Sequence, residues 1–473
     1  MLSRFARCLG AGSLSRPVPL AARCARTQAV RGFKTSTASL AAARNASPKA
    51  VKKDKVEKVS ATLTEQSQIR IKGETAGDSA EYRTFPNLWL RDNCQCESCV
   101  NPDTRQRNFD TFQLPKDVRP VKFSETEKAL EIEWSDSHNS SHPWSWLRSL
   151  FKKGYIEEFG KDHPTRYWGQ DVGGKSIEEM PPYVDYEHAL NDKEGMARLT
   201  RNIWMRGFCF VENSPHTPEA TESLLKKIGP IQNTHYGGFY DFIPDLAMAD
   251  TAYTNLALPA HTDTTYFTEP AGLQAFHCLS HEAPPDADPS EPLGGESLLV
   301  DGLNCARILQ KKYPDAYDVL RAVKLPWHAS GNEGIAIAPR CAFPVIEEHG
   351  NTPFRIRWNN DDRGVVNVFQ AEQWYDAAQK WVEIVRHESN EFWFKLNPGR
   401  ILIFNNWRIM HGRSAFQGTR RICGAYVPYD DFVSRYRTTN FEHEQVIGHN
   451  LHSSPSDTLA RSKTDYNRII AGP

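Results

Sequence analysis

The chain has 473 residues, of which 39% are hydrophobic and 24% charged, which is enough for two folded domains with sizeable cores. No stretch approaches the roughly 18 consecutive apolar residues of a membrane span, so we expect no membrane association. The formal net charge is -1, and residues 1–46 carry seven Arg, one Lys and no acidic residue. Without these eight positive charges the remainder has a formal charge of -9, which argues against a nucleic-acid surface.

Residues 1–46 have the composition of a mitochondrial transit peptide. They are rich in Arg, Ser and Ala, and they lack the apolar block of a secretory signal. The segment Arg31–Phe33 resembles a mitochondrial processing site. The alternative is a basic tail that binds an acidic partner. We therefore expect the segment to direct the protein to the mitochondrial matrix.

Residues 47–80 are expected to be a linker that runs into a first strand near Thr62–Ile71. Residues 81–155 are predicted to form a small N-terminal β domain, because short apolar runs alternate there with polar residues. Its strands are expected at Asn87–Leu90, Val121–Phe123 and Leu130–Trp134. A Pro- and Gly-rich passage over residues 160–183 predicts the boundary to a larger domain.

The larger domain is predicted over residues 180–440, before a C-terminal tail at 441–473. It is expected to open with a helix at about Tyr186–Arg206, a strand at Gly207–Val211 and a second helix that has Thr217 as its N-cap.

From about residue 250 onward short strands dominate, interrupted by helices at roughly Leu303–Val323 and Ala371–His387. The strands are expected at Leu273–Cys278, Ser297–Val300, Gly334–Ala338, Arg355–Trp358, Phe392–Leu396, Ile401–Phe404 and Ile422–Val427. Many short strands with a few inserted helices predict a mainly β fold (α+β), either a β-sandwich or a jelly-roll barrel.

A His-x-Asp triplet follows Pro259-Ala260. In an extended strand His261 and Asp263 point to the same side. Two His and one carboxylate on one face of Fe(II) leave three adjacent positions for a keto acid and dioxygen. The third ligand must come from another strand, and the best candidate is His411, which follows a hydrophobic strand and precedes Gly412. The triplet alone is a weak signal, and its alternative is a loop His capped by a nearby carboxylate.

Arg420 strengthens the iron interpretation. It lies nine residues after His411, at the start of a predicted strand, where its guanidinium can hold the distal carboxylate of 2-oxoglutarate through two parallel hydrogen bonds. Arg421 would point to the opposite face. His277 and His281 lie four residues apart on a predicted strand, so we expect structural roles for both.

Two segments closely resemble the γ-butyrobetaine/trimethyllysine dioxygenase family of Fe(II)/2-oxoglutarate oxygenases. They are Asp250–Leu258, running into His261–Phe267, and Asn390–Arg400. The resemblance covers about residues 82–440 and implies a double-stranded β-helix core, a mitochondrial location and a homodimer. It also implies hydroxylation of Nε-trimethyl-lysine at carbon 3 with release of succinate and carbon dioxide, in the first step of carnitine biosynthesis. Ascorbate would keep the iron reduced.

Carried over by motif, the iron ligands would be His261, Asp263 and His411, and Arg420 would be the 2-oxoglutarate anchor. Gly294–Leu298 matches the family's Gly-Gly-acid-Ser/Thr strand, so Ser297 is also expected to contact 2-oxoglutarate.

The resemblance also implies how the substrate binds. A quaternary ammonium ion has no N–H to donate, so aromatic faces usually surround it. By resemblance to the butyrobetaine branch, the cage would consist of Tyr236, Tyr240, Tyr253 and Tyr426. Asp250 is expected to pair with the α-ammonium of an amino-acid substrate, and Asn359 and Asn360 with its carboxylate. For any single Tyr the alternative is core or rim packing.

Cys94, Cys96 and Cys99 crowd into six residues, and three thiols cannot all form disulfides with one another. His138 would complete a closed tetrahedral Zn(II) site, which is structural because it leaves no position for water. The butyrobetaine branch has this zinc pattern at matching spacing. His142 is the rival fourth ligand, and free thiols on a loop are the other alternative.

Two other functions stay open at this point. The first is γ-butyrobetaine hydroxylation on the same fold, which differs only in the preferred small-molecule substrate. The second is a non-catalytic, zinc-stabilised β-barrel binding protein, which would not consume dioxygen or 2-oxoglutarate.

Overall fold

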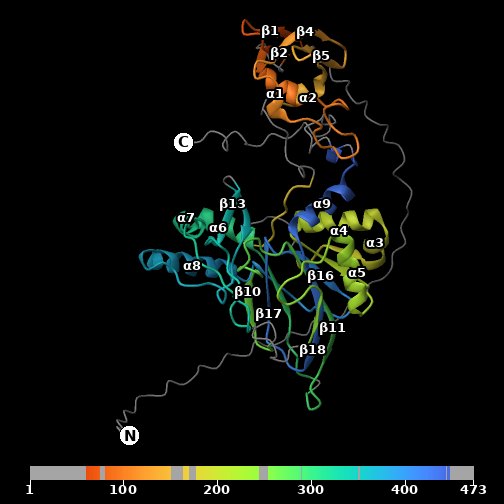
Figure 1. The fold of residues 1–473 in the computed structure, drawn as a ribbon. Helices are drawn as coiled ribbons and strands as arrows, with labels where there is room; N and C mark the ends of the chain where they lie inside the picture. Colours follow the sequence, from red (N-terminus) through yellow and green to blue (C-terminus); the bar gives the residue numbers. More distant parts are fainter. Residues whose placement is uncertain are drawn as a thin grey trace, which may run out of the picture. The chain divides into compact units, whose positions relative to one another are not determined.

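The computed structural model describes residues 60–74, 80–150, 163–169, 177–243, 254–288, 290–349, 352–443 and 445–447 (Figure 1). The expected transit peptide, the first part of the expected linker and most of the expected C-terminal tail lie outside these residues. In the described ranges no helix has both the length and the apolar character that crossing a membrane requires.

The N-terminal module contains two antiparallel sheets of three strands each, in the orders β1-β2-β3 and β4-β5-β6. The strands are β1 (Ser60–Leu63), β2 (Ile69–Glu74), β3 (Ala80–Phe85), β4 (Pro120–Glu125), β5 (Ala129–Trp134) and β6 (Asn139–Pro143), with helices α1 (Asn87–Asp92) and α2 (Trp144–Ser149). Leu90, Leu130 and Leu147 are fully buried in their common core. The module therefore has a hydrophobic core of its own.

Two expectations for this module are wrong. Asn87–Leu90 lies in helix α1 instead of a strand. Pro86 precedes the helix with φ -60 and ψ 134, and four residues are too few for periodicity to distinguish a helix from a strand. The single strand expected at Thr62–Ile71 is two strands, β1 and β2, because the chain turns at Ser67, which has a positive φ of 58.

Two sheets form the core of the larger domain, which confirms the expected mainly β, jelly-roll fold with inserted helices. Their strand orders are β7-β8-β16-β11-β18-β9 and β10-β17-β12-β15. The first sheet comprises β7 (Tyr183–Asp185), β8 (Phe208–Glu212), β16 (Ile401–Asn405), β11 (Leu273–Glu282), β18 (Thr419–Val427) and β9 (Tyr240–Phe242). The second comprises β10 (Leu258–His261), β17 (Ile409–Arg413), β12 (Ser297–Asp301) and β15 (Glu391–Phe394). Neighbouring strands come from distant parts of the sequence, so the fold brings remote side chains together.

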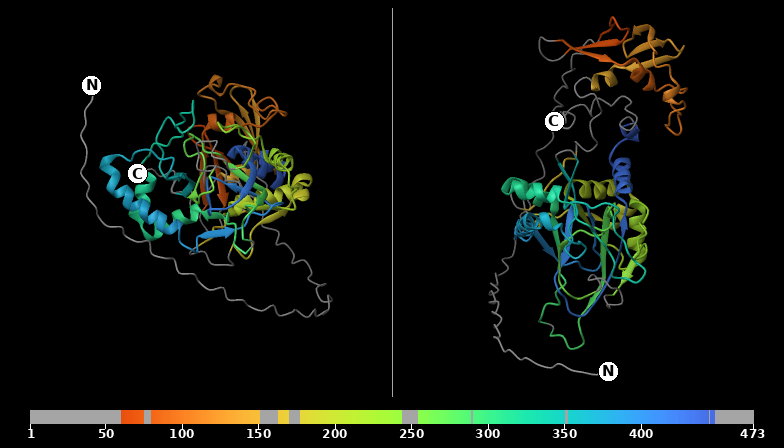
Figure 2. Two further views of the ribbon diagram at one scale, coloured as in Figure 1. Left: turned by 90° about the horizontal axis from the view of Figure 1, so that it is seen from below. Right: turned by 60° about the vertical axis from the view of Figure 1, so that its left-hand side comes forward.

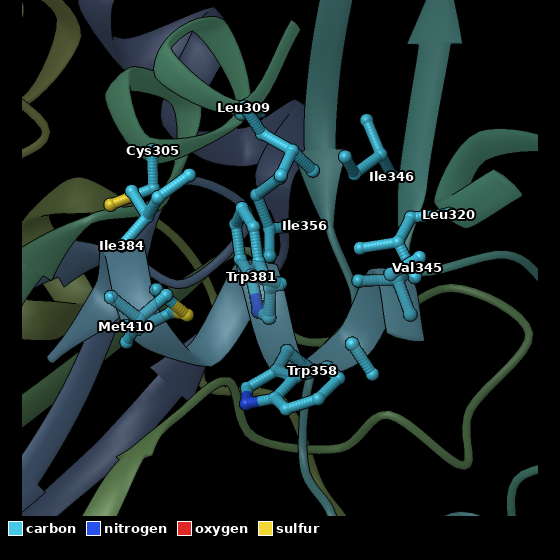
Figure 3. Close-up of a cluster of buried hydrophobic side chains, with 14 of the residues drawn as sticks. Cys305, Leu309, Leu320, Val345, Ile346, Ile356, Trp358, Trp381, Ile384 and Met410 are labelled. Carbon is cyan, nitrogen blue, oxygen red and sulfur yellow. The ribbon is translucent and has the colours of Figure 1, made fainter. Parts of the chain in front are cut away.

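Helices lie on two sides of the strands (Figures 1 and 2). One group packs against the six-stranded sheet and comprises α3 (Tyr186–Asn191), α4 (Lys193–Arg206), α5 (Pro218–Ile228) and α9 (Tyr429–Asn440). The other comprises α6 (Gly302–Lys312), α7 (Pro314–Ala322) and α8 (Ala371–Val385), which pack with the hairpin β13 (Ile346–His349) and β14 (Thr352–Ile356). Figure 3 shows Trp381 of α8 in the hydrophobic core that α6, α7 and α8 share with this hairpin, where it is fully buried. The two cores support the sheets from opposite sides.

The structure divides two expected helices. The helix expected at Tyr186–Arg206 is interrupted at Asp192, which has φ -124 and whose carboxylate accepts the N–H of Glu194 as an N-cap. The helix expected at Leu303–Val323 breaks before Pro314, because proline has no N–H for the preceding turn. The expected N-cap of α5 is confirmed, since the Thr217 hydroxyl accepts the N–H of Ala220.

Two expected strands also differ. Gly334–Ala338 is a loop with a single bridge between Ala329 and Ile337. The strand expected at Arg355–Trp358 begins earlier and ends at Ile356, because Trp358 has turned to bond with Thr262. Local apolar alternation therefore misplaced strand ends where the chain turns toward the cavity described next.

Candidate active site

His261, Asp263 and His411 lie together at the edge of the four-stranded sheet. His261 ends β10, and His411 lies directly opposite it on β17 as its register partner. Nε2 of His261 is 3.2 Å from Oδ1 of Asp263, and Nε2 of His411 is 3.8 Å from the same oxygen. One ligand atom from each of the three residues lies within 4.8 Å of the other two. The fold therefore brings His411 to two side chains that lie about 150 residues earlier in the sequence.

Hydrogen bonds fix the His261 ring and the backbone of Asp263 in an arrangement suited to a metal. Nδ1 of His261 donates to the carbonyl oxygen of Pro259 at 2.8 Å, so a neutral ring keeps its lone pair on Nε2. The side chain of Asn406 accepts the N–H of Asp263 and donates to its carbonyl oxygen. Nδ1 of His411 is buried and has no hydrogen-bond partner among the described residues. Two imidazole nitrogens and one carboxylate oxygen thus face one point, which is the donor set that Fe(II) takes in a facial triad.

The charges of the three groups depend on one another. Burial alone would lower the pKa of His261, but the hydrogen bond and charge of Asp263 outweigh it and raise the pKa to about 8. Burial would raise the pKa of Asp263, yet the charge of His411 and the hydrogen bond from His261 hold it well below its usual range. Burial and the charge of His261 lower the pKa of His411 to about 3. The carboxylate is therefore ionised, and a bound cation would replace the proton on His261.

A cavity of about 480 Å³ opens beside the triad. Arg420 lines it from β18 and is only 4% exposed. Among the described residues the Arg420 guanidinium has no hydrogen bond or ion pair to another side chain, and the nearest aromatic ring, that of Phe416, lies 6.0 Å away, so its N–H donors are available to a ligand in the cavity. Ser297, at the start of β12, also lines the cavity. Arg421 points away from it and pairs with Asp241 at 2.5 Å.

Three of the four Tyr expected to form the cage lie in described residues, and all three line this cavity. The rings of Tyr240 and Tyr426 meet edge to face with centroids 6.0 Å apart. The Tyr240 hydroxyl donates to the carbonyl oxygen of Ala275 at 2.7 Å, whereas the Tyr426 hydroxyl donates to Oδ2 of Asp263 at 2.8 Å. Tyr236 contributes a third aromatic side chain. The cavity wall is therefore aromatic next to the triad.

Of the remaining residues expected to contact the substrate, one lines the cavity, one does not, and two lie outside the described residues. Asn359 lines the cavity, but Asn360 does not; it lines a neighbouring hollow, and its amide oxygen accepts from Arg363 at 3.0 Å. Tyr253 and Asp250 lie outside the described residues. His277 is buried between Thr221 and the N–H of Gly399, and His281 bonds to the carbonyl oxygen of Gln417, in agreement with their expected structural roles.

Two residues at the triad were not anticipated from the sequence. Gln274 donates to Oδ2 of Asp263 at 2.6 Å, and Asn406 holds the backbone of Asp263. Gln274 is one of two buried polar residues, with His277, in the otherwise apolar first part of β11, which is a signal that the sequence contains. Its partner Asp263 cannot be inferred without the packing of the two sheets.

A second cluster, formed by Cys94, Cys96, Cys99 and His138, lies in the N-terminal module. Nε2 of His138 is 3.3 Å from Sγ of Cys94, 3.7 Å from Sγ of Cys96 and 3.4 Å from Sγ of Cys99. Thiolates at about 2.3 Å and an imidazole at about 2.0 Å from a tetrahedral zinc ion would stand roughly 3.5 Å apart. The distances from His138 to the three thiols therefore match those expected around a zinc ion.

The surroundings of this cluster distinguish the two rival histidines. His142 points away from the thiols, contacts the Ser140 hydroxyl at 3.0 Å and stacks on Trp146. Arg91 donates to Sγ of Cys99 at 3.4 Å, a contact that favours a thiolate. Burial, as the main cause, raises the pKa of Cys94 to about 12, so a cation is needed to hold that side chain as a thiolate. The geometry thus favours His138 over His142.

Known proteins are similar to this chain along most of its length. The family model described as "Taurine catabolism dioxygenase TauD, TfdA family" matches residues 173–426, and "Gamma-butyrobetaine hydroxylase-like, N-terminal" matches residues 75–148. A Neurospora crassa protein named "Trimethyllysine dioxygenase" is 49% identical and covers 77% of this chain and 82% of its own. The Bos taurus "Trimethyllysine dioxygenase, mitochondrial" is 36% identical over 75% of this chain and 82% of its own. The human "Gamma-butyrobetaine dioxygenase" is 26% identical over 76% and 91%. On these matches, the chain belongs to the TauD/TfdA dioxygenase family, in the branch of the trimethyllysine dioxygenases.

Proposed function

We propose that the protein hydroxylates Nε-trimethyl-L-lysine at carbon 3 and couples this reaction to oxidative decarboxylation of 2-oxoglutarate to succinate and carbon dioxide. This is the first step of carnitine biosynthesis. The observation that carries the proposal is the convergence of His261, Asp263 and His411 on one point beside an aromatic cavity that contains an available Arg420. The names of the relatives supply the substrate.

In this proposal His261, Asp263 and His411 hold Fe(II), and Asp263 supplies the negative charge. When bound, iron supplies the activation of dioxygen and the removal of a hydrogen atom from the substrate C–H. The protein needs no general base for this chemistry. Its side chains position the two organic substrates and exclude water.

Arg420 and Ser297 would bind the co-substrate. The Arg420 guanidinium lies in the cavity wall with its N–H groups available, so it can donate two parallel hydrogen bonds to the distal carboxylate of 2-oxoglutarate. The Ser297 hydroxyl lines the same cavity. Together they would fix the keto end of 2-oxoglutarate toward the triad.

The trimethylammonium group would be bound by aromatic faces, each of which contributes up to about 2 kcal/mol when desolvated. The described members of this cage are Tyr236, Tyr240 and Tyr426, and we propose Tyr253 as the fourth. Asp250 would pair with the α-ammonium group. Asn359 is the better placed of the two Asn for the substrate carboxylate, because Asn360 faces the neighbouring hollow.

Several further features belong to the proposal. Zn(II) bound by Cys94, Cys96, Cys99 and His138 would stabilise the small N-terminal domain, residues 81–155, beside a catalytic domain at 180–440. Residues 1–46 would be a transit peptide for the mitochondrial matrix, in line with the name of the bovine relative. Ascorbate would keep the iron reduced, and the working enzyme would be a homodimer.

Succinate formation with a panel of quaternary-ammonium substrates tests the proposal. With Fe(II), ascorbate and 2-oxoglutarate, trimethyllysine should drive succinate and product formation far better than γ-butyrobetaine. The reverse preference would assign the γ-butyrobetaine hydroxylase function instead. Absence of any succinate above that of His261→Ala would point to a non-catalytic binding protein. Asp250→Asn should reduce the preference for trimethyllysine, and an unchanged preference would remove Asp250 from the specificity argument.

A further inference from the structure

The two carboxylate oxygens of Asp263 have different surroundings. Oδ1 faces the Nε2 atoms of His261 and His411 at 3.2 and 3.8 Å. Oδ2 accepts two hydrogen bonds on the other side, from Nε2 of Gln274 at 2.6 Å and from the Tyr426 hydroxyl at 2.8 Å. Only one of the two oxygens is therefore directed at the point where the histidine nitrogens meet.

The two donors form a pair in the six-stranded sheet. Gln274 on β11 and Tyr426 on β18 are direct register partners, so their side chains leave the same face of the sheet. Gln274 is 2% exposed and Tyr426 is 7% exposed, so water does not compete with either bond. Both reach across to Asp263, which follows the edge strand β10 of the other sheet.

The amide orientation of Gln274 has a measurable cost. Its oxygen Oε1 is buried and has no hydrogen-bond partner among the described residues. A flipped amide would instead place Oε1 against the ionised carboxylate, so only the present orientation makes an attractive contact. An unsatisfied buried acceptor destabilises the folded state. The bond to Asp263 offsets this cost because a hydrogen bond to a charged acceptor is strong.

We propose that Gln274 and Tyr426 are positioning residues that occupy Oδ2 and restrict Asp263 to binding iron through Oδ1 alone. A carboxylate that used both oxygens would fill four coordination positions together with the two His. A carboxylate that uses one leaves three positions, as a bidentate keto acid plus dioxygen require. The inference rests on the proposed function for the identity of the metal.

Tyr426 would also link the substrate site to the metal ligand. Its ring lines the cavity against Tyr240, while its hydroxyl holds Asp263. A substrate that packs on the Tyr426 ring therefore contacts a side chain whose other end fixes the iron ligand. The Tyr240 hydroxyl donates instead to the carbonyl oxygen of Ala275, and among the described residues it makes no hydrogen bond to Asp263.

This difference provides a matched pair of variants. Tyr426→Phe and Tyr240→Phe each remove one hydroxyl from one cavity Tyr, but only the first removes a hydrogen bond to Asp263. Gln274→Leu removes the second donor at similar volume. Affinities for Fe(II) and Co(II) are measured without oxygen or substrate, and the visible spectrum of bound Co(II) reports its coordination number. Thermal unfolding of the metal-free proteins shows that each variant is folded.

We expect metal affinity to fall about 10- to 100-fold in Tyr426→Phe and in Gln274→Leu, as for other residues that orient a metal ligand, with a changed Co(II) spectrum. Tyr240→Phe should keep the wild-type metal affinity and Co(II) spectrum, even if its turnover of substrate changes. Unchanged affinity and spectrum in both Tyr426→Phe and Gln274→Leu would overturn the positioning role alone. Wild-type protein that binds metal with these properties but does not convert trimethyllysine would overturn only the proposed function.

Discussion

The cysteine cluster and the triad are two metal-ligand sets built in different ways. Cys94, Cys96 and Cys99 come from one short loop and meet His138, so these four side chains would fill every tetrahedral position of a bound zinc ion. The triad has three ligands from two paired segments that are distant in sequence, and it faces a cavity of about 480 Å³. In the proposed function, the number of ligands and the space beside them would separate a stabilising zinc site from a reactive iron site.

The largest expected effect is the loss of an iron ligand. His261→Ala should abolish iron binding at the triad and reduce succinate and product formation to background, because two ligands cannot hold Fe(II) in this geometry. Iron content and 2-oxoglutarate turnover measure the effect. His188→Ala, on the exposed face of α3, is the control and should match the wild type. Iron retained at full occupancy in His261→Ala would contradict the triad.

Loss of a ligand from the cysteine cluster should lower the stability of the N-terminal module and leave turnover at the triad largely unaffected. Cys94→Ser is expected to remove the bound zinc and much of the roughly 10 kcal/mol that zinc coordination contributes to folding of a small domain. Metal content and amide hydrogen exchange over residues 60–150 would show this, while the barrel keeps its protection. Cys341→Ser, at an exposed thiol, should change neither. Stable, zinc-free wild-type protein would mean that these thiols are free.

A smaller effect is expected at the anchor for 2-oxoglutarate. Arg420→Lys should raise the KM for 2-oxoglutarate about 100-fold, because an ammonium cannot replace a bidentate guanidinium at a buried site. Arg421→Lys is the neighbouring control, since Arg421 is 44% exposed and pairs with Asp241 on the other face. Equal KM values for the two variants would remove Arg420 from the co-substrate site.

The smallest effect concerns the rival fourth zinc ligand. His142→Gln should leave one zinc per chain and lower the unfolding free energy of the module by only about 1–2 kcal/mol, through loss of the Ser140 contact and the stacking on Trp146. Zinc content and denaturant unfolding are the measurements. If zinc were lost here and kept in His138→Ala, the two histidines would have to exchange roles.

The sequence predicted those residues of the triad and of the cysteine cluster that lie close together along the chain. His261 and Asp263 are two residues apart in an extended segment, and the three Cys lie within six residues, so spacing alone brings their side chains together. Arg420 and Arg421 were separated by strand alternation, and the structure places them on opposite faces. Many short strands predicted a β-sandwich or a jelly-roll barrel, and the family resemblance implied the jelly-roll.

What the sequence did not predict depends on contacts between sheets. Gln274 on β11 meets Asp263, which follows β10 of the other sheet, and no local pattern encodes that pairing. Asn360 does not line the cavity because the chain turns after β14 and carries this side chain into the neighbouring hollow. Helix α1 was not predicted because its apolar run is too short to distinguish a helix from a strand. Periodicity reports burial, but it does not report which partner a buried group will have.

The pairing of His261 with His411 has a consequence for the iron-free protein. β10 is the outermost strand of its sheet, and its pairing with β17 is irregular between Leu258 and His261. A metal ion held by both residues would cross-link this border strand to β17, its sheet neighbour among the described residues, so iron would protect the strand from local opening. The iron-free protein should therefore be cleaved by proteases near β10 more readily than the iron-loaded protein.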